Sequence, residues 1–151
     1  MANVVFNSAK GRVVELYNRV KSNDPTNSAL ILVPLSAVAA DATLIDQATL
    51  AAVLAGGSTE QTTMGRKTLT DAELAAFPSP DTTNDRYDVS LPTVTWTAAS
   101  GAAIVCLLVC YDSDTTTGAD ANIVPLTKFD FAQTPSGADI QMTTGVFFRA
   151  S

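Results

Sequence analysis

Residues 87–131 read YDVSLPTVTWTAASGAAIVCLLVCYDSDTTTGADANIVPLTKFDF, and the fold can be argued outward from this stretch. Its middle part, residues 104–111 (IVCLLVCY), is apolar at every position. A strand with one face in water alternates apolar and polar residues, so a strand without alternation is expected to be covered on both faces. The flanking segments 94–97 (VTWT) and 123–131 have strand character too. The stretch therefore predicts three successive strands, with the middle one central to the core.

The remaining strand and helix signals are spread on both sides of this stretch. Residues 12–21 (RVVELYNRVK) carry apolar side chains at helical spacing, which predicts a helix with one buried face. Residues 29–35 (ALILVPL) predict a strand that is apolar on both faces, and Pro34 indicates an edge or a bulge near its end. Residues 140–142 and 146–149 are weaker strand signals, bounded by turn residues.

Two further helices are predicted in the first half of the chain. Residues 40–55 are rich in Ala and Leu, and they predict one helix that begins at Asp41 or Thr43 and ends at two glycines. Thr70 and Glu73 have the spacing of a capping box, which predicts a short helix ending by Phe77, because prolines follow.

These elements define the expected fold class. The chain is predicted to be a single domain over residues 1–151, mainly β with an α+β character. Connections after residue 87 are too short for parallel crossovers, so we expect an antiparallel β-sandwich with two or three short helices in the N-terminal half. Residues 1–11 are predicted to form an extended N-terminal arm that docks on a neighbouring subunit through Val4, Val5 and Phe6. An edge strand or a frayed end is the alternative.

Composition excludes several classes of function. The chain has a net charge of −6 and contains no His. An acidic chain is a poor partner for nucleic acid, and the lack of His removes the usual general base and zinc ligand. No spacing supports a serine–lysine or carboxylate dyad, so we expect no enzyme and no cofactor. The longest apolar run is too short for a membrane helix, and we expect no membrane partner.

The cysteines and the surface composition are also informative. Cys106 and Cys110 on one strand would have Cα atoms about 13 Å apart, which is beyond disulfide reach, so buried free thiols are expected. Charged residues make up only 16% of the chain. A lightly charged surface rich in Thr is common in proteins that pack against other subunits, although an ordinary β domain also explains it.

Two features are weak candidates for ligand binding. The loop after the central strand carries Asp112, Asp114 and Asp120, oxygen ligands of the kind that Ca²⁺ takes, but its glycine and twelfth position do not match an EF-hand loop. A polar hairpin loop with turn residues explains it more simply. Trp96 is the only tryptophan and could stack on a sugar or a base, yet a core position is the commoner use of such a residue.

The chain resembles a family of small virion structural proteins of tailed bacteriophages. The resemblance covers nearly the whole chain and rests on five stretches, AKGRVVELYNRVKSNDPTNSALILVPLS, GRKTLTD, DTTNDRYDVSLPTVTWTAASG, LLVCYDSDTTTGADANIVPLTKFDF and GVFFRAS. It implies a β-sandwich particle protein without a catalytic motif. It also implies assembly in the host bacterial cytoplasm and a final place in the virion.

Three functions follow as hypotheses from this resemblance. The first is a capsid decoration or cement protein, a head-associated oligomer that binds the major capsid protein or other virion proteins and stabilises the head lattice. The second is a tail, neck or fibre component. The third is a small β-sandwich module that binds a ligand or sugar, and it requires an exposed aromatic platform around Trp96.

Overall fold

The computed structural model describes residues 3–77 and 80–151. Within these residues, six strands form one antiparallel sheet in the order β1-β8-β7-β2-β3, with β4 also paired to β2. The strands of this main sheet are β1 (Val4–Val5), β2 (Ala29–Ala37), β3 (Thr59–Glu60), β4 (Lys67–Leu69), β7 (Ile104–Asp112) and β8 (Val124–Gln133). Two small antiparallel sheets accompany it, and they pair β5 (Tyr87–Leu91) with β10 (Gly145–Ala150) and β6 (Val94–Trp96) with β9 (Ile140–Met142).

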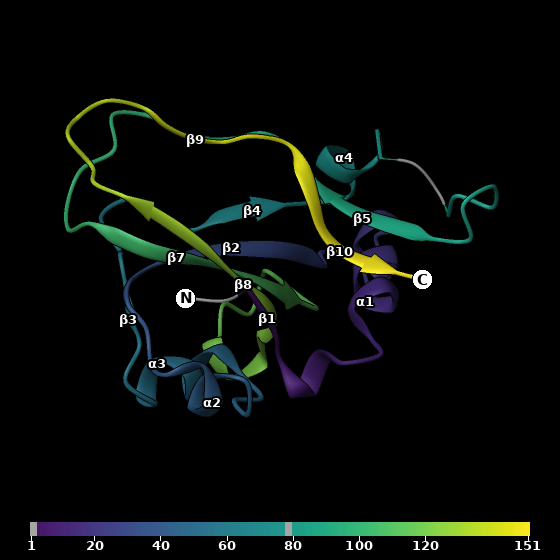
Figure 1. Ribbon diagram of the computed structural model, residues 1–151, viewed down its shortest axis with the longest axis horizontal. Coiled ribbons are helices and arrows are strands. Elements are labelled where there is room, and N and C mark those ends of the chain that lie inside the picture. Colours follow the sequence, from purple (N-terminus) through teal and green to yellow (C-terminus); the bar gives the residue numbers. More distant parts are fainter. Residues whose placement is uncertain (1–2, 78–79) are drawn as a thin grey trace.

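The helices flank the main sheet. The α-helices are α1 (Val13–Lys21), α2 (Asp41–Leu44), α3 (Leu50–Ala55) and α4 (Asp71–Leu74), and η1 (Asn7–Ala9) and η2 (Asp120–Asn122) are 3-10 turns. Figure 1 shows α2 and α3 on one side of the main sheet, whereas α4, β9 and β10 lie on the other side. The sheet therefore has cover on both faces.

The expected central strand is confirmed as β7. It pairs with β2 along one edge and with β8 along the other, so Leu108 lies between Val33 and Lys128. Almost all of its side chains are buried, on both faces. The absence of alternation in its sequence thus has the expected cause, because each face is covered by other elements.

The helix predicted over residues 12–21 is confirmed as α1. The apolar residues at helical spacing are buried, and they are Val13, Leu16, Tyr17 and Val20. Tyr17 connects this helix to the small sheet. Its hydroxyl donates to the Ser90 carbonyl oxygen at 3.0 Å, and its ring centroid lies 6.0 Å from that of Phe147. The helix is therefore fixed against both β5 and β10.

The single helix predicted over residues 40–55 is wrong, because the structure contains α2 and α3 with a break between them. At the break, the Ile45 carbonyl accepts a hydrogen bond from Asn7 N–H, and Leu50 N–H donates to the Ile123 carbonyl. Thr49 then caps α3 by accepting from Ala52 N–H at 3.1 Å. Tertiary partners thus satisfy the backbone groups that a continuous helix would use, whereas the expected end at Gly56 is confirmed.

The predicted capping box is confirmed at the start of α4. Thr70 N–H donates to a Glu73 carboxylate oxygen at 2.7 Å. In return, the Thr70 side chain accepts from the backbone N–H of Glu73, the third residue of the helix. The helix ends at Leu74, earlier than the limit at Phe77. The first residues of the proline-containing stop, 78 and 79, lie outside the described residues.

The fold class is α+β with antiparallel sheets, as expected, and strands β9 and β10 confirm the two weaker signals. Four short α-helices are described instead of two or three, and all lie before residue 75. Pro34 is not at a free edge of the sheet. It lies opposite Leu107 of β7, and the register of β2 against β3 shifts just beyond it, between Leu35 and Ala37.

Candidate functional site

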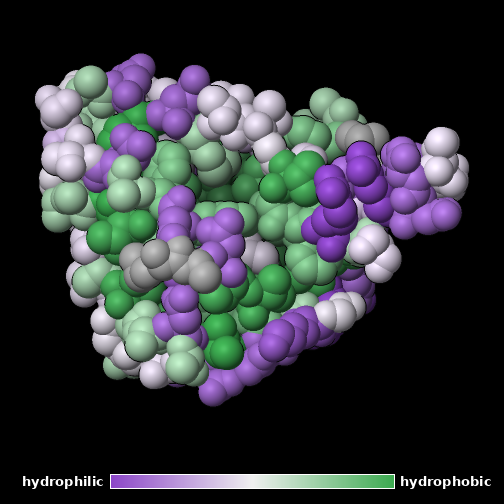
Figure 2. Space-filling view, in the orientation of Figure 1, coloured by the Kyte–Doolittle hydropathy of each residue, from purple (hydrophilic) through white to green (hydrophobic). Residues whose placement is uncertain are grey.

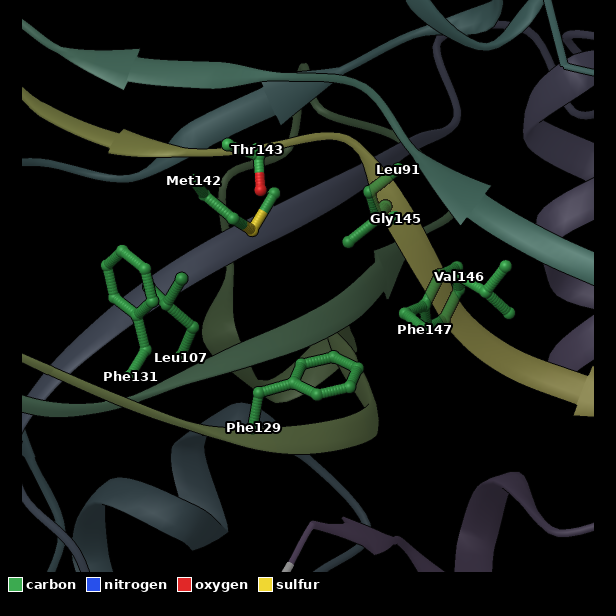
Figure 3. Close-up of a pocket in the computed structure, with 9 residues that line it drawn as sticks. All are labelled: Leu91, Leu107, Phe129, Phe131, Met142, Thr143, Gly145, Val146 and Phe147. Carbon is green, nitrogen blue, oxygen red and sulfur yellow. The ribbon is translucent and has the colours of Figure 1, made fainter.

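An apolar pocket opens between the main sheet and the strands above it (Figure 3). Its volume is about 150 Å³. Side chains of β7 and β8 form its floor, and residues from β5, β9 and β10 close it from the opposite side. The lining residues are Leu91, Leu107, Phe129, Phe131, Met142, Thr143, Gly145, Val146 and Phe147.

Strand register explains why the floor of this pocket is apolar. Leu107 of β7 and Phe129 of β8 are direct cross-strand partners, and Phe131 lies two residues further on the same face of β8. The Phe129 ring meets Phe147 edge-on, with 6.3 Å between centroids. The Phe131 ring lies tilted against Trp96, with 6.4 Å between centroids, so aromatic contacts join β8 to strands of both small sheets.

An irregularity in β10 shapes the opposite wall. The register against β5 shifts between Val146 and Phe148, which is a β-bulge. Phe147 sits within this bulge and is buried against the core, whereas Val146 is 48% exposed at the pocket mouth. Among the described residues, Val146 is the large apolar side chain that is most exposed to solvent.

Among the described residues, the side chains that line the pocket are apolar apart from one hydroxyl group, that of Thr143. These lining residues include no acid, base or thiol. Figure 2 shows hydrophobic surface in a hollow at the centre of the view, with polar residues around it. A single aromatic or branched aliphatic group matches the size and polarity of this space.

The predicted calcium ligands do not come together. Asp112 accepts from Asp114 N–H at 3.0 Å, Asp114 accepts from Thr116 N–H at 3.0 Å, and Asp120 binds Arg66 instead. Over residues 3–77 and 80–151, no group of three acidic or thiol side chains is placed to hold a metal ion. The first two carboxylates stabilise turns, in agreement with the hairpin-loop alternative.

Two of the three predicted interaction residues form an edge strand, and the third, which follows it in sequence, is buried. Val4 and Val5 form β1, which pairs with Lys128 and Thr127 of β8, and Phe6 is fully buried in the core. The expected extended arm over residues 1–11 therefore needs correction in its described part, because the segment folds onto its own sheet and then turns at η1. Residues 1 and 2 of that arm lie outside the described residues.

Trp96 and the cysteines are core residues. Trp96 is 2% exposed and donates its indole N–H to the Gly65 carbonyl at 3.0 Å, so it offers no platform for a sugar. Cys106 and Cys110 are free and buried, as expected. Burial raises the pKa of Cys106 to about 11 and raises that of Cys110 as well, which disfavours the reactive thiolate form of both.

Two charged groupings have no counterpart among the sequence predictions. Arg66 bridges Glu60 and Asp120, with nitrogen–oxygen distances of 2.6 Å to each carboxylate. These hydrogen bonds raise the pKa of the Arg66 guanidinium. Lys128 is fully buried and lies 2.7 Å from Asp41. Both groupings join segments that are far apart in sequence, so local patterns carry no sign of them.

The pocket itself was not predicted from the sequence. Phe129, Met142 and Val146 come from strands of three different sheets, and only the tertiary arrangement brings them together. No local sequence pattern indicates this arrangement.

Comparison with protein-family models, curated proteins and solved structures finds no match. Within the described part of the chain, no helix has both the length and the apolar character needed to cross a membrane.

Proposed function

We propose that the chain is a structural protein of a tailed-bacteriophage virion, most simply a capsid decoration or cement protein. It would stabilise the head lattice through protein–protein contacts with the major capsid protein or another virion protein. The sequence resemblance motivates this proposal. The observation that carries it on the structural side is the open apolar pocket beside Val146.

The pocket supports a contact function through its chemistry. Interfaces commonly place a few apolar anchors in pockets that exclude water. A volume of about 150 Å³, lined mostly by apolar atoms, fits one such anchor from a neighbouring protein. The exposed Val146 side chain at the mouth would lose its contact with water when that anchor binds, which favours association.

The charge distribution is compatible with the same role. The net charge of −6 disfavours contact with nucleic acid, so the contact is with protein in this proposal. Charged residues are few, and a surface with few charges has a small free-energy cost of desolvation when subunits pack. Weak contacts of this kind become strong when a lattice repeats them many times.

We also infer that the two small sheets form an incomplete second layer of a β-sandwich. In this arrangement, the β5–β10 and β6–β9 pairs lie together over β7 and β8. The rings of Trp96, Phe131, Phe129 and Phe147, which approach one another in pairs, are the contacts that support it. The pocket would then be the place where the second layer fails to close.

The test uses heads from a phage in which the coding sequence for this chain has been deleted. Purified wild-type chain is expected to bind these heads, whereas Val146→Asp is expected to bind at least tenfold more weakly, because it places a charge at the mouth. Thr83→Asp is the matched control, since it adds the same charge at an exposed loop position. Equal binding by both variants and the wild type would remove the pocket from the proposed interface.

A further inference from the structure

The first described residues dock on the chain as a separable segment, which we define as residues 3–9. Its anchor is Phe6, which is fully buried and donates its backbone N–H to the Leu126 carbonyl at 3.0 Å. Asn7 N–H donates to the Ile45 carbonyl at 2.8 Å, and Asn3 accepts from Asp130 N–H at 3.1 Å. All of these partners lie far along the chain, on β8 and at the end of α2.

The receptor for this segment is a sheet edge. β1 contributes only two residues to the pairing, whereas β8 is ten residues long. When the segment leaves, the outer edge of β8 and the site of Phe6 are uncovered. Unpaired edges of this kind accept any segment that offers the same hydrogen bonds. The same segment of a second copy offers them without any change in sequence.

A hinge follows the segment directly. Lys10 and Gly11 are exposed, and Gly11 has φ +80° with nothing within 4 Å of the position where a Cβ would lie. One backbone hydrogen bond spans the turn, from Arg12 N–H to the Ala9 carbonyl at 2.9 Å. Opening it requires only the undocking of a short segment, which is a local event and not global unfolding.

We propose that residues 3–9 exchange between copies of this chain, so that β1 and Phe6 of one copy dock on β8 of the next. The closed and exchanged forms contain the same docking contacts and differ mainly at the hinge. A tether of this length gives the segment an effective concentration of about 1 mM at its own receptor. Dilute chains therefore stay closed, and exchange dominates where copies are crowded.

This inference deepens the proposed function, on which its biological role rests, because a particle lattice supplies the crowding. The exchange itself is a property of the purified chain. It can fail while the virion role holds, and it can succeed in a protein that is not part of a virion. The two claims are therefore tested separately.

The experiment uses the full chain with Val5→Cys and Thr127→Cys, because these two residues are direct partners across β1 and β8. Opposed residues in an antiparallel pair are about 4.5–5.5 Å apart at Cα, within disulfide reach. If the segment docks on its own chain, the disulfide forms within that chain. If the segment is exchanged, the disulfide forms between two chains. Non-reducing gels and light scattering distinguish the two products after oxidation.

Two conditions are compared. At micromolar concentration we expect only the bond within one chain, and at about 1 mM we expect covalent dimers and longer species. Adding Gly11→Pro is expected to produce the dimers at micromolar concentration, because proline fixes φ near −65° and excludes the turn. Gly118→Pro is the control, since Gly118 also has positive φ, at 61°, but lies in a distant loop.

The inference is overturned if the bond stays within one chain at every concentration and with Gly11→Pro. It is also overturned if dimers form without the bond between chains, or if Gly118→Pro produces them equally well. Circular dichroism establishes whether Gly11→Pro is folded. If it is not, the concentration series of the Val5→Cys/Thr127→Cys chain alone decides the outcome.

Discussion

The buried ammonium group of Lys128 lies 2.7 Å from the Asp41 carboxylate, joining β8 to the start of α2 across 87 positions of sequence. The Lys128 side chain has no exposed surface, whereas Asp41 is 34% exposed. Asp130 also approaches the ammonium, at 3.8 Å. A buried charge is tolerated only when it is paired, so this contact holds a polar group inside an otherwise apolar layer.

Removing the Asp41 carboxylate is expected to lower the free energy of unfolding more than removing the Lys128 ammonium group. Asp41→Ala leaves the buried ammonium with a weaker partner, and we expect a loss of about 3 kcal/mol in the free energy of unfolding. Lys128→Met removes the charge and keeps the apolar stem, so its loss should be about 1 kcal/mol. Urea denaturation measures both. A larger loss for Lys128→Met than for Asp41→Ala would contradict this ordering.

The central strand makes a second prediction. Leu108 is fully buried between two neighbouring strands, and Leu108→Ala is expected to lower the free energy of unfolding by about 2–5 kcal/mol through the cavity it leaves. Val105 lies on the same strand but is only partly buried, so Val105→Ala is the control, with a loss of about 1 kcal/mol or less. Equal losses from the two variants in urea denaturation would contradict the full burial of Leu108 in the core.

Gly101 makes a third prediction, because it has φ +101° and a close neighbour. A Cβ at this position would lie 2.5 Å from Gln61 Nε2, which donates to the carbonyls of Ser100 and Ala102. Gly101→Ala therefore strains the backbone and displaces the Gln61 side chain from its two hydrogen bonds. We expect a loss of about 1–3 kcal/mol in the free energy of unfolding. Gly118→Ala is strained in the backbone alone and should cost about 1 kcal/mol. A lower melting temperature for Gly118→Ala than for Gly101→Ala would be inconsistent with a stabilising role of the Gln61 hydrogen bonds.

A fourth prediction concerns alkaline pH. Burial raises the pKa of Tyr17 from 10.0 to about 12 and that of Cys106 from 9.0 to about 11. The unfolded chain releases these protons at the lower, ordinary values, so ionisation favours unfolding. Stability is therefore complete below about pH 9 and falls as the pH rises toward 12.

The measurement is the free energy of unfolding between pH 7 and pH 12. Tyr17→Phe keeps the ring and removes the ionising hydroxyl, so the decline should become shallower in that variant. It also loses the hydrogen bond to Ser90, which lowers stability at every pH. A decline of unchanged steepness in Tyr17→Phe would show that Tyr17 does not contribute to it.

Local sequence patterns predicted the elements that depend on local chemistry. The unbroken apolar run 104–111, the helical spacing of residues 12–21 and the Thr70–Glu73 capping box each appear as expected. In all three, the hydrogen bonds or the buried face follow from residues within a few positions of one another.

Elements that depend on distant partners were not predictable in this way. The Ala-rich stretch 40–55 has good helix propensity, yet Asn7 and Ile123 take backbone partners at its middle and divide it. Phe6 looked like part of a free arm, because nothing near it indicates that β8 supplies a site for its ring. The pocket likewise depends on how β9 and β10 cross β8, which no short pattern encodes.

The proposed function is that of a component of a phage head. Its most direct test is quantitative mass spectrometry of purified particles from the phage that encodes the chain, with heads separated from tails. We predict many copies per particle, all with the heads. A few copies found only with the tails would favour a tail, neck or fibre component, and absence from both fractions would contradict a virion role altogether.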